Sequence, residues 1–225
     1  MPHALSFAGE VVHLLGCGAL FWPREALLVV ADLHLEKGSA MARAGWLVPP
    51  HDSIDALDRL ADALARTGAR HVLALGDSFH DRGGPMRLSD PARTRLAGLL
   101  SMRRWTWVVG NHDGACAAAL GGEVVPQLCI GGIAFRHEAD RAEAGPEISG
   151  HFHPKVRLPT ASGGTLARRC FALAGDRLVL PAYGSFAGGL DIASADLAHA
   201  LGEVPEALVP LADGIARWRA RARAA

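Results

Sequence analysis

The 225-residue sequence is 50% hydrophobic and carries 23 lysines and arginines against 23 aspartates and glutamates. A chain of this length can bury one sizeable core, so we expect a single domain over residues 1–225. The formal net charge of zero excludes a global field that would steer the whole molecule onto nucleic acid or an anionic membrane. Any affinity for a polyanion must therefore be local.

The sequence contains no apolar run of membrane-spanning length, and its start, MPHALSFAGEVVHLLGCG, lacks the basic region and long apolar stretch of a secretion signal. The four cysteines are scattered and form no C-x-x-C pair, which is typical of a reduced protein without disulfides. These observations predict a cytoplasmic protein with no membrane partner.

Short apolar runs, each closed by polar residues or glycine, predict strands at residues 26–32, 71–77, 104–111, 128–137 and 177–185. Between the first two runs, apolar residues at helical spacing predict a helix over residues 51–70 that Gly68 ends. A second helix is predicted from Asp90 to Leu100. The first half is thus βαβαβ, and the glycine turns after residue 120 favour a mixed sheet or a second sheet.

The basic stretch GIARWRARARAA closes the chain at residues 214–225, beyond a motif-bearing core at about 26–190. Its composition predicts a short basic helix or a frayed tail. A solvated tail and a binding element are both open at this point.

Residues of the types that bind metals follow the predicted strands. The first run ends in D-x-H, the second in G-D and the third in G-N-H-D, and later segments add R-H-E and G-H-F-H-P. The carboxyl ends of parallel strands face one crevice, and residues two apart on an extended segment point the same way, so these side chains should converge. The candidate ligands are Asp32, His34, Asp77, Asn111, His137, His151 and His153.

Seven ligands are too many for one ion, because a single four-coordinate zinc would leave desolvated carboxylates and imidazoles unused. Two divalent ions that share a bridging carboxylate would use them all. The nitrogen and oxygen donors without thiolate favour manganese or iron, with zinc as a further choice. Two ions roughly 3.5–4 Å apart can convert a bridging water to the attacking hydroxide and clamp a phosphoryl oxygen. The sequence therefore predicts a dimetal enzyme that hydrolyses phosphoesters.

One histidine of the G-N-H-D-G turn is left over beside the ligands. We predict that His112 protonates or hydrogen-bonds the leaving-group oxygen, and that Asp113 orients its ring. Asp81 either fixes a ligand histidine or caps a turn, and His80 is expected to be accessory rather than a ligand.

Basic residues accompany the motifs, namely Arg82, Arg87, Arg136, Lys155 and Arg157. They predict a positively charged rim around the metal crevice, with Arg82, Arg136 and Lys155 as candidate substrate-binding residues. The alternative is a scatter of ordinary solvated cations in an arginine-rich chain.

The ordered set D-x-H, G-D-x-x-x-D, G-N-H-D, H-E and G-H-x-H-P, over residues 32–154, resembles the calcineurin-like metallophosphoesterase superfamily. The resemblance implies an α/β fold of four layers, a two-sheet β-sandwich flanked by helices, here with no lid domain. It also implies how the ligands divide: Asp32, His34 and His153 on one metal, Asn111, His137 and His151 on the other, and Asp77 bridging the two.

Within the superfamily, DLHLEKGSAMARAGWLVPP followed by GDSFHD resembles the bacterial ligase-associated DNA damage response endonucleases. This resemblance implies a DNA-repair setting, with an ATP-dependent DNA ligase, a helicase and an exonuclease-like protein as partners. The sequence departs from the pattern at Glu36, where a small residue is common. A carboxylate near the site would weaken the approach of a phosphate backbone.

We therefore expect a manganese- or iron-dependent phosphodiesterase, an endonuclease that acts on single-stranded DNA or processed DNA ends. Two alternatives stay open: a phosphodiesterase or phosphatase for a small nucleotide or cofactor, and a non-catalytic subunit that docks onto repair partners. The intact ligand set with His112 argues against the docking subunit, because a scaffold has no need to retain it.

Overall fold

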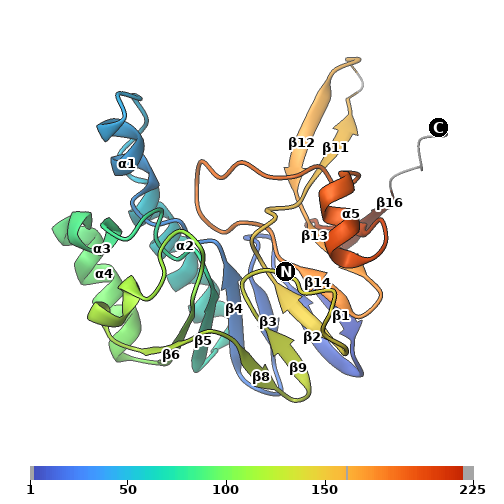
Figure 1. Cartoon of the computed structure of the whole chain (residues 1–225), viewed down its shortest axis with the longest axis horizontal. Helices are drawn as coiled ribbons and strands as arrows, with labels where there is room; N and C mark the ends of the chain where they lie inside the picture. Colours follow the sequence, from blue (N-terminus) through green and yellow to red (C-terminus); the bar gives the residue numbers. More distant parts are fainter. Residues whose placement is uncertain (1–2, 161, 220–225) are drawn as a thin grey trace.

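The computed structural model describes residues 3–160 and 162–219 and contains two seven-stranded β-sheets that pack face to face (Figure 1). The first sheet follows the chain order: β1 (His3–Phe7), β2 (Glu10–Leu14), β3 (Leu20–Trp22), β4 (Leu27–Ala31), β5 (His71–Leu75), β6 (Arg104–Val108) and β7 (Glu123–Val125). Strands β1 to β4 pair antiparallel, and β4 to β7 pair parallel.

The second sheet has the order β16 (Ile215–Arg219), β15 (Glu206–Pro210), β13 (Phe171–Ala174), β14 (Arg177–Val179), β10 (Glu147–Ser149), β9 (Ile133–Phe135) and β8 (Leu128–Ile130). A separate antiparallel hairpin, β11 (Lys155–Pro159) and β12 (Thr165–Arg169), projects from the sandwich (Figure 1). This hairpin is the only element of the described residues that projects in this way, and they contain no inserted lid domain.

Helices form the two outer layers. Their bounds are α1 (Lys37–Arg43), α2 (Asp52–Thr67), α3 (Gly84–Arg87), α4 (Asp90–Ser101) and α5 (Ala195–Leu201), with a 3-10 turn η1 (Cys116–Leu120). Helices α2 and α4 pack on the outer face of the first sheet, and α5 covers the second sheet (Figure 1). The four-layer α/β sandwich predicted from the sequence is confirmed, as are the helices at 51–70 and 90–100.

Strand β4 explains why its sequence is apolar throughout. All five of its residues are buried, and they alternate between two cores. Leu28 and Val30 face the helices, whereas Leu27, Val29 and Ala31 face the second sheet. A strand covered on both faces has no polar side, so the alternation that marks a surface strand is absent. The polar residues that follow Ala31 therefore mark the point at which the chain leaves the core.

Two predicted strands differ from the structure. The run at 128–137 is a hairpin of β8 and β9, because Gly131 and Gly132 adopt φ of 57° and 79° and form a tight turn between them. The run at 177–185 is a strand only over β14, and the chain then leaves the sheet.

The prediction of a basic helix or frayed tail is wrong for the part of the C-terminal stretch that the structure describes. Residues 215–219 form edge strand β16, paired antiparallel with β15. Arg217 donates to Glu206 on β15 at 3.0 Å, and Arg219 lies 3.4 Å from the same carboxylate. Opposite charges across a strand pair stabilise this arrangement. Residues 220–225 lie outside the described residues.

Both ends of the described chain contribute to the core between the sheets. Leu5 and Phe7 of β1 lie in the same buried cluster as Leu208 of β15. No helix within residues 3–160 and 162–219 is long and apolar enough to cross a membrane.

Candidate dimetal centre

The candidate ligands lie in the loops that follow strands of both sheets at one edge of the sandwich. Parallel strands β4, β5 and β6 lead to the first three motifs, and parallel strands β9 and β10 lead to the last two. The loops are tied together directly, because the His34 backbone N–H donates to the Asp77 carbonyl at 2.9 Å and the Gly150 N–H to the His137 carbonyl at 2.9 Å. Strand order thus brings together residues more than a hundred positions apart.

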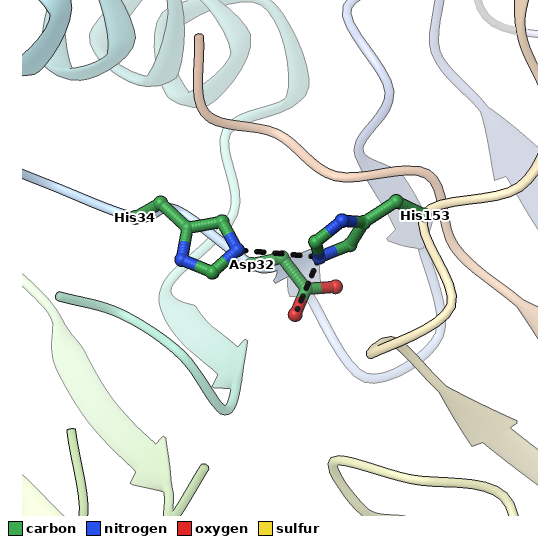
Figure 2. Close-up of side chains that lie close together, drawn as sticks. All are labelled: Asp32, His34 and His153. Atoms are coloured by element: carbon green, nitrogen blue, oxygen red, sulfur yellow. Dashed lines mark hydrogen bonds and ion pairs between the residues drawn. The ribbon is translucent and has the colours of Figure 1, made fainter. Parts of the chain in front are cut away.

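One group of ligand atoms comes from the first and last motifs. The Nε2 atoms of His34 and His153 are 3.2 Å apart, and His153 Nε2 is 3.3 Å from Asp32 Oδ1. Figure 2 shows the three side chains close together, with Asp32 and His34 from the loop after β4 and His153 from the loop after β10. Burial, followed by the neighbouring His153, lowers the pKa of His34 to about 2. The His34 ring is therefore neutral and offers a lone pair.

A second group comes from the middle motifs. His137 Nε2 lies 2.8 Å from Asn111 Oδ1, 3.2 Å from His151 Nδ1 and 3.5 Å from Asp77 Oδ2. The other nitrogen of the His137 ring, Nδ1, donates to the Leu75 carbonyl at 3.2 Å, which leaves the Nε2 lone pair facing the cluster. A backbone acceptor on the far nitrogen is the usual way to fix a metal-binding histidine.

The two groups are adjacent, since Asp32 Oδ1 lies 3.8 Å from the His137 ring. Asp77 lies with His137 and His151, and Asp32 with His34 and His153, whereas the division of the seven ligands between two metals stays a prediction. A bridging role for Asp77 stays a prediction.

The donor arrangement fits divalent ions. Each aspartate commits one oxygen to a backbone N–H, Asp32 Oδ2 to His151 at 2.9 Å and Asp77 Oδ1 to His112 at 2.9 Å, and turns the other toward histidine nitrogens. Asp32 Oδ1 is buried and accepts no hydrogen bond from the described residues. A buried carboxylate oxygen without a donor is costly unless a cation neutralises it. Neutral imidazoles and carboxylates without thiolate suit manganese, iron or zinc.

The ligand loops are strained. Five of the seven candidates have φ between 44° and 69°, namely Asp32, His34, Asp77, His151 and His153. A left-handed backbone at a residue other than glycine costs on the order of 1–3 kcal/mol and persists only where its surroundings enforce it. Asp32 and His34 therefore lie in a loop after the end of β4, and both have left-handed backbones. The extended conformation that the sequence predicted for this pair is wrong.

Gly110 makes room for Asp77, because a Cβ at this position would lie against the backbone nitrogen and Oδ1 of that aspartate. We expect Gly110→Ala to displace the carboxylate and lower metal affinity about 10- to 100-fold, the usual effect of disturbing a ligand's support. Metal titration of the stripped protein measures this. Gly98→Ala on α4, where a Cβ meets no atom within 4 Å, is the control. Unchanged metal affinity in Gly110→Ala would contradict the expected contact.

His112 lies at the mouth of the site, with its side chain 44% exposed and its Nε2 3.9 Å from Asp77 Oδ2. Its Nδ1 donates to the His80 carbonyl at 3.1 Å, so a carbonyl orients the ring. The expectation that Asp113 does so is corrected: this buried carboxylate accepts from the backbone N–H groups of Phe79 and Gly110, at 3.1 and 3.3 Å. Burial raises the pKa of Asp113. Asp113 therefore holds the loop and not the ring.

The other residues of the second motif also take definite places. Asp81 accepts two hydrogen bonds from Arg87, at 2.8 and 2.7 Å, and one from the Gly83 backbone, so of the two alternatives the structure places it in a turn. His80 belongs to neither ligand group, and its ring lies 5.6 Å from the His112 ring.

The predicted rim loses several members. Arg136 is 13% exposed and pairs with Glu147 at 3.1 Å and Asp140 at 3.6 Å, so the prediction that it binds substrate is corrected to a structural role. Arg87 is bonded to Asp81, and Arg157 pairs with Asp191 at 3.2 Å while its side chain stays 72% exposed. Arg82, which is exposed and close to the G-N-H-D-G turn, and Lys155 remain candidate rim residues.

Lys37 is a further candidate rim cation that the sequence analysis did not single out. It begins α1, three residues after His34. Burial lowers the pKa of the Lys37 ammonium, and the charge of Asp77 acts in the opposite direction. The signal was present in the motif DLHLEK, where a cation follows the ligands within one turn.

The Glu36 carboxylate does not enter the crevice. Its Oε1 accepts from the Ser53 hydroxyl on α2 at 2.8 Å, and the Glu36 backbone N–H donates to the same hydroxyl at 2.8 Å. The expectation that Glu36 would repel a phosphate backbone is therefore wrong.

The geometry agrees with comparisons to known proteins. The model of the calcineurin-like phosphoesterase family matches residues 26–178, which include every candidate ligand. The structure is similar to the crystal structure of Pseudomonas putida nuclease MPE, with a TM-score of 0.74 and 25% identity over 93% of this chain and 96% of that one. A weaker likeness, with a TM-score of 0.42 and 16% identity over 73% and 83% of the two chains, joins it to Yfce, a phosphoesterase from E. coli. No curated protein matches the sequence.

Proposed function

The chain belongs to the calcineurin-like phosphoesterase family and is a metal-dependent phosphoester hydrolase, and we propose that it is a phosphodiesterase that cleaves DNA. The observation that carries this proposal is the pair of ligand groups in a fold similar, over nearly its whole length, to a nuclease. Residues from both chain ends share one core, which supports treating residues 1–225 as one domain.

In the proposed reaction, Asp32, His34 and His153 would hold one ion and the second group would hold the other, and we assign Asp77 to both. When bound, these ions, for which we favour manganese or iron, would supply an acidified water and positive charge at the phosphoryl oxygens. His112, fixed by the His80 carbonyl, presents Nε2 to the leaving-group oxygen and donates or shares a proton there.

Local charge supports a polyanionic substrate in a chain whose net charge is zero. Lys37 begins α1, three residues after His34, and Lys155 begins β11, two residues after His153, so a cation follows each of these two candidate ligands closely. Arg82 adds a third beside the His112 turn. Three cations around one reaction centre can contact successive phosphates of a strand.

The setting that we propose is bacterial DNA repair in the cytoplasm, with single-stranded DNA or processed ends as substrate. A repair ligase, a helicase and an exonuclease-like protein are the partners. The motifs DLHLEKG and GDSFHD, in which the sequence resembles ligase-associated endonucleases, support this setting.

The test compares hydrolysis of a single-stranded oligonucleotide with that of small nucleotide esters, after metal stripping and manganese reconstitution, at several salt concentrations. We expect oligonucleotide cleavage whose apparent affinity falls with salt. Lys37→Ala and Lys155→Ala should each reduce the slope of log affinity against log salt by about 0.7, the value for one single-strand phosphate contact.

Arg104→Ala is the matched control, because this exposed arginine begins β6 at the opposite end of the strand from the ligands. Cleavage of the small esters alone would move the substrate to small nucleotides. Inactivity with every divalent metal would instead favour the docking subunit.

A further inference from the structure

The segment between β14 and α5 runs directly beside the ligands of the first group. Its first part is bonded to the D-x-H loop, with the Tyr183 N–H donating to the Ala31 carbonyl at 2.8 Å and the Gly184 N–H to the Asp32 carbonyl at 3.0 Å. Its last part is bonded to the G-H-F-H-P loop, with the Leu190 N–H donating to the Phe152 carbonyl at 3.1 Å. In Figure 2 this segment passes as a pale orange-red ribbon beside His34 and His153.

Close packing fixes the same segment at two glycines. A Cβ on Gly184 would lie against the Leu33 carbonyl, and a Cβ on Gly189 against the His153 carbonyl. The four residues between these glycines must therefore cross the edge of the metal site with little freedom to move away.

Phe186 lies at the middle of this crossing. Its side chain is 40% exposed, and its backbone has φ of 58°. An exposed phenylalanine is unremarkable by itself, but a bulky residue in the left-handed region is an outlier that points to a functional constraint. Five of the eight other left-handed residues besides glycine are candidate ligands, Asp32 and His34 of the adjoining loop among them.

The residues next to Phe186 in the chain limit how far its backbone can lie from the candidate ligands. Only Ser185 separates it from Gly184, so its Cα lies within about 8 Å of the Cα of the residue bonded to Asp32. On its other side, the Lys155 ammonium donates to the Ala187 carbonyl at 3.0 Å. Phe186 thus stands in the chain between the residue bonded to Asp32 and a residue whose carbonyl binds a candidate rim cation.

We propose that Phe186 is a stacking platform for the nucleobase next to the scissile phosphate, with Lys155 at the adjoining phosphate. This inference rests on the proposed cleavage of nucleic acid and names how the substrate is positioned. An aromatic face stacks on any base, so the platform selects for a splayed or single-stranded nucleotide and not for a sequence. The strained backbone presents the ring in advance of binding.

The experiment combines a base deletion in the substrate with a ring deletion in the protein. A set of oligonucleotides carries a single abasic site at successive positions around the cleaved bond, and each is cleaved by the manganese-loaded wild type, Phe186→Ala, Phe186→Leu and Phe186→Trp. We expect removal of one particular base to lower wild-type kcat/KM about 10- to 100-fold. The same base removal should have no effect in Phe186→Ala and Phe186→Leu, and Phe186→Trp should keep the wild-type response.

Metal content and melting temperature of each variant report whether the site is intact. An equal response of wild type and Phe186→Ala to every abasic position would overturn the platform while leaving DNA cleavage in place. Failure of the wild type to cleave any oligonucleotide, with small esters still hydrolysed, would overturn the proposed substrate and the platform with it.

Discussion

Replacement of Asp77 by asparagine is expected to remove bound metal and to lower kcat/KM about a thousandfold or more. Asp77 Oδ2 lies 3.5 Å from His137 Nε2, while Oδ1 accepts from the His112 backbone N–H. Asparagine keeps the shape of the side chain but removes the negative charge that a bridging position requires. Metal ions stabilise the transition state by several kcal/mol, and every 1.36 kcal/mol is tenfold in rate.

The measurement is metal content per chain after manganese loading and desalting, together with turnover of bis-p-nitrophenyl phosphate. Asp81→Asn is the matched control, because this carboxylate stands four residues further along the same motif and is bonded to Arg87 and not to the ligand groups. Loss of both ions is expected for Asp77→Asn alone. Loss of one ion would assign Asp77 to the second group only, and retention of two would remove it from the centre.

The candidate ligands were predictable from sequence because each motif stands immediately after a strand that the core defines. Where β4 and β5 end, an aspartate follows the buried apolar side chains within two residues, and His34 follows β4 within three. Parallel pairing of strands then brings these ends together. The reason for the convergence was less well predicted, since the left-handed loop of Asp32 and His34 donates a hydrogen bond to the Asp77 carbonyl and accepts one from the Gly184 N–H, and both partners are far along the chain.

Contacts that depend on tertiary packing were not predictable from the motifs. Arg136 precedes a ligand histidine and looks like a rim cation, but Glu147, its partner, lies on the neighbouring strand β10. Glu36 follows the ligands, and its charge was expected to repel phosphate. Instead, the Ser53 hydroxyl on α2 donates to the Glu36 carboxylate and accepts from the Glu36 backbone N–H. In both cases a residue far along the chain decides which way a charged side chain faces.

The first strands were missed for a different reason. Strand β1 alternates buried and exposed positions over the short segment HALSF, and β2 and β3 are of similar length. Runs of three to five residues with one apolar face give little periodicity on which to base a prediction. These antiparallel strands extend the first sheet away from the ligands, so the omission did not affect the site.

His112→Gln should leave metal content unchanged and lower kcat/KM about 100- to 10,000-fold on substrates with poor leaving groups. The His112 backbone N–H, which supports Asp77, is unaffected by the side-chain change. Glutamine can still donate a hydrogen bond but cannot transfer a proton, so the loss should grow as the leaving group becomes more basic. A series of aryl phosphodiesters measures this as a steeper dependence of log kcat/KM on leaving-group pKa.

His80→Gln is the control for the loss of a neighbouring imidazole, because its ring lies 5.6 Å from that of His112 and belongs to neither ligand group. The His80 carbonyl, which accepts from His112 Nδ1, remains in this variant, so the His112 ring keeps its orientation. The leaving-group dependence should therefore stay at the wild-type value in His80→Gln and become steeper in His112→Gln alone. A uniform loss across the series in His112→Gln would make the ring a binding contact and would leave proton donation to another group.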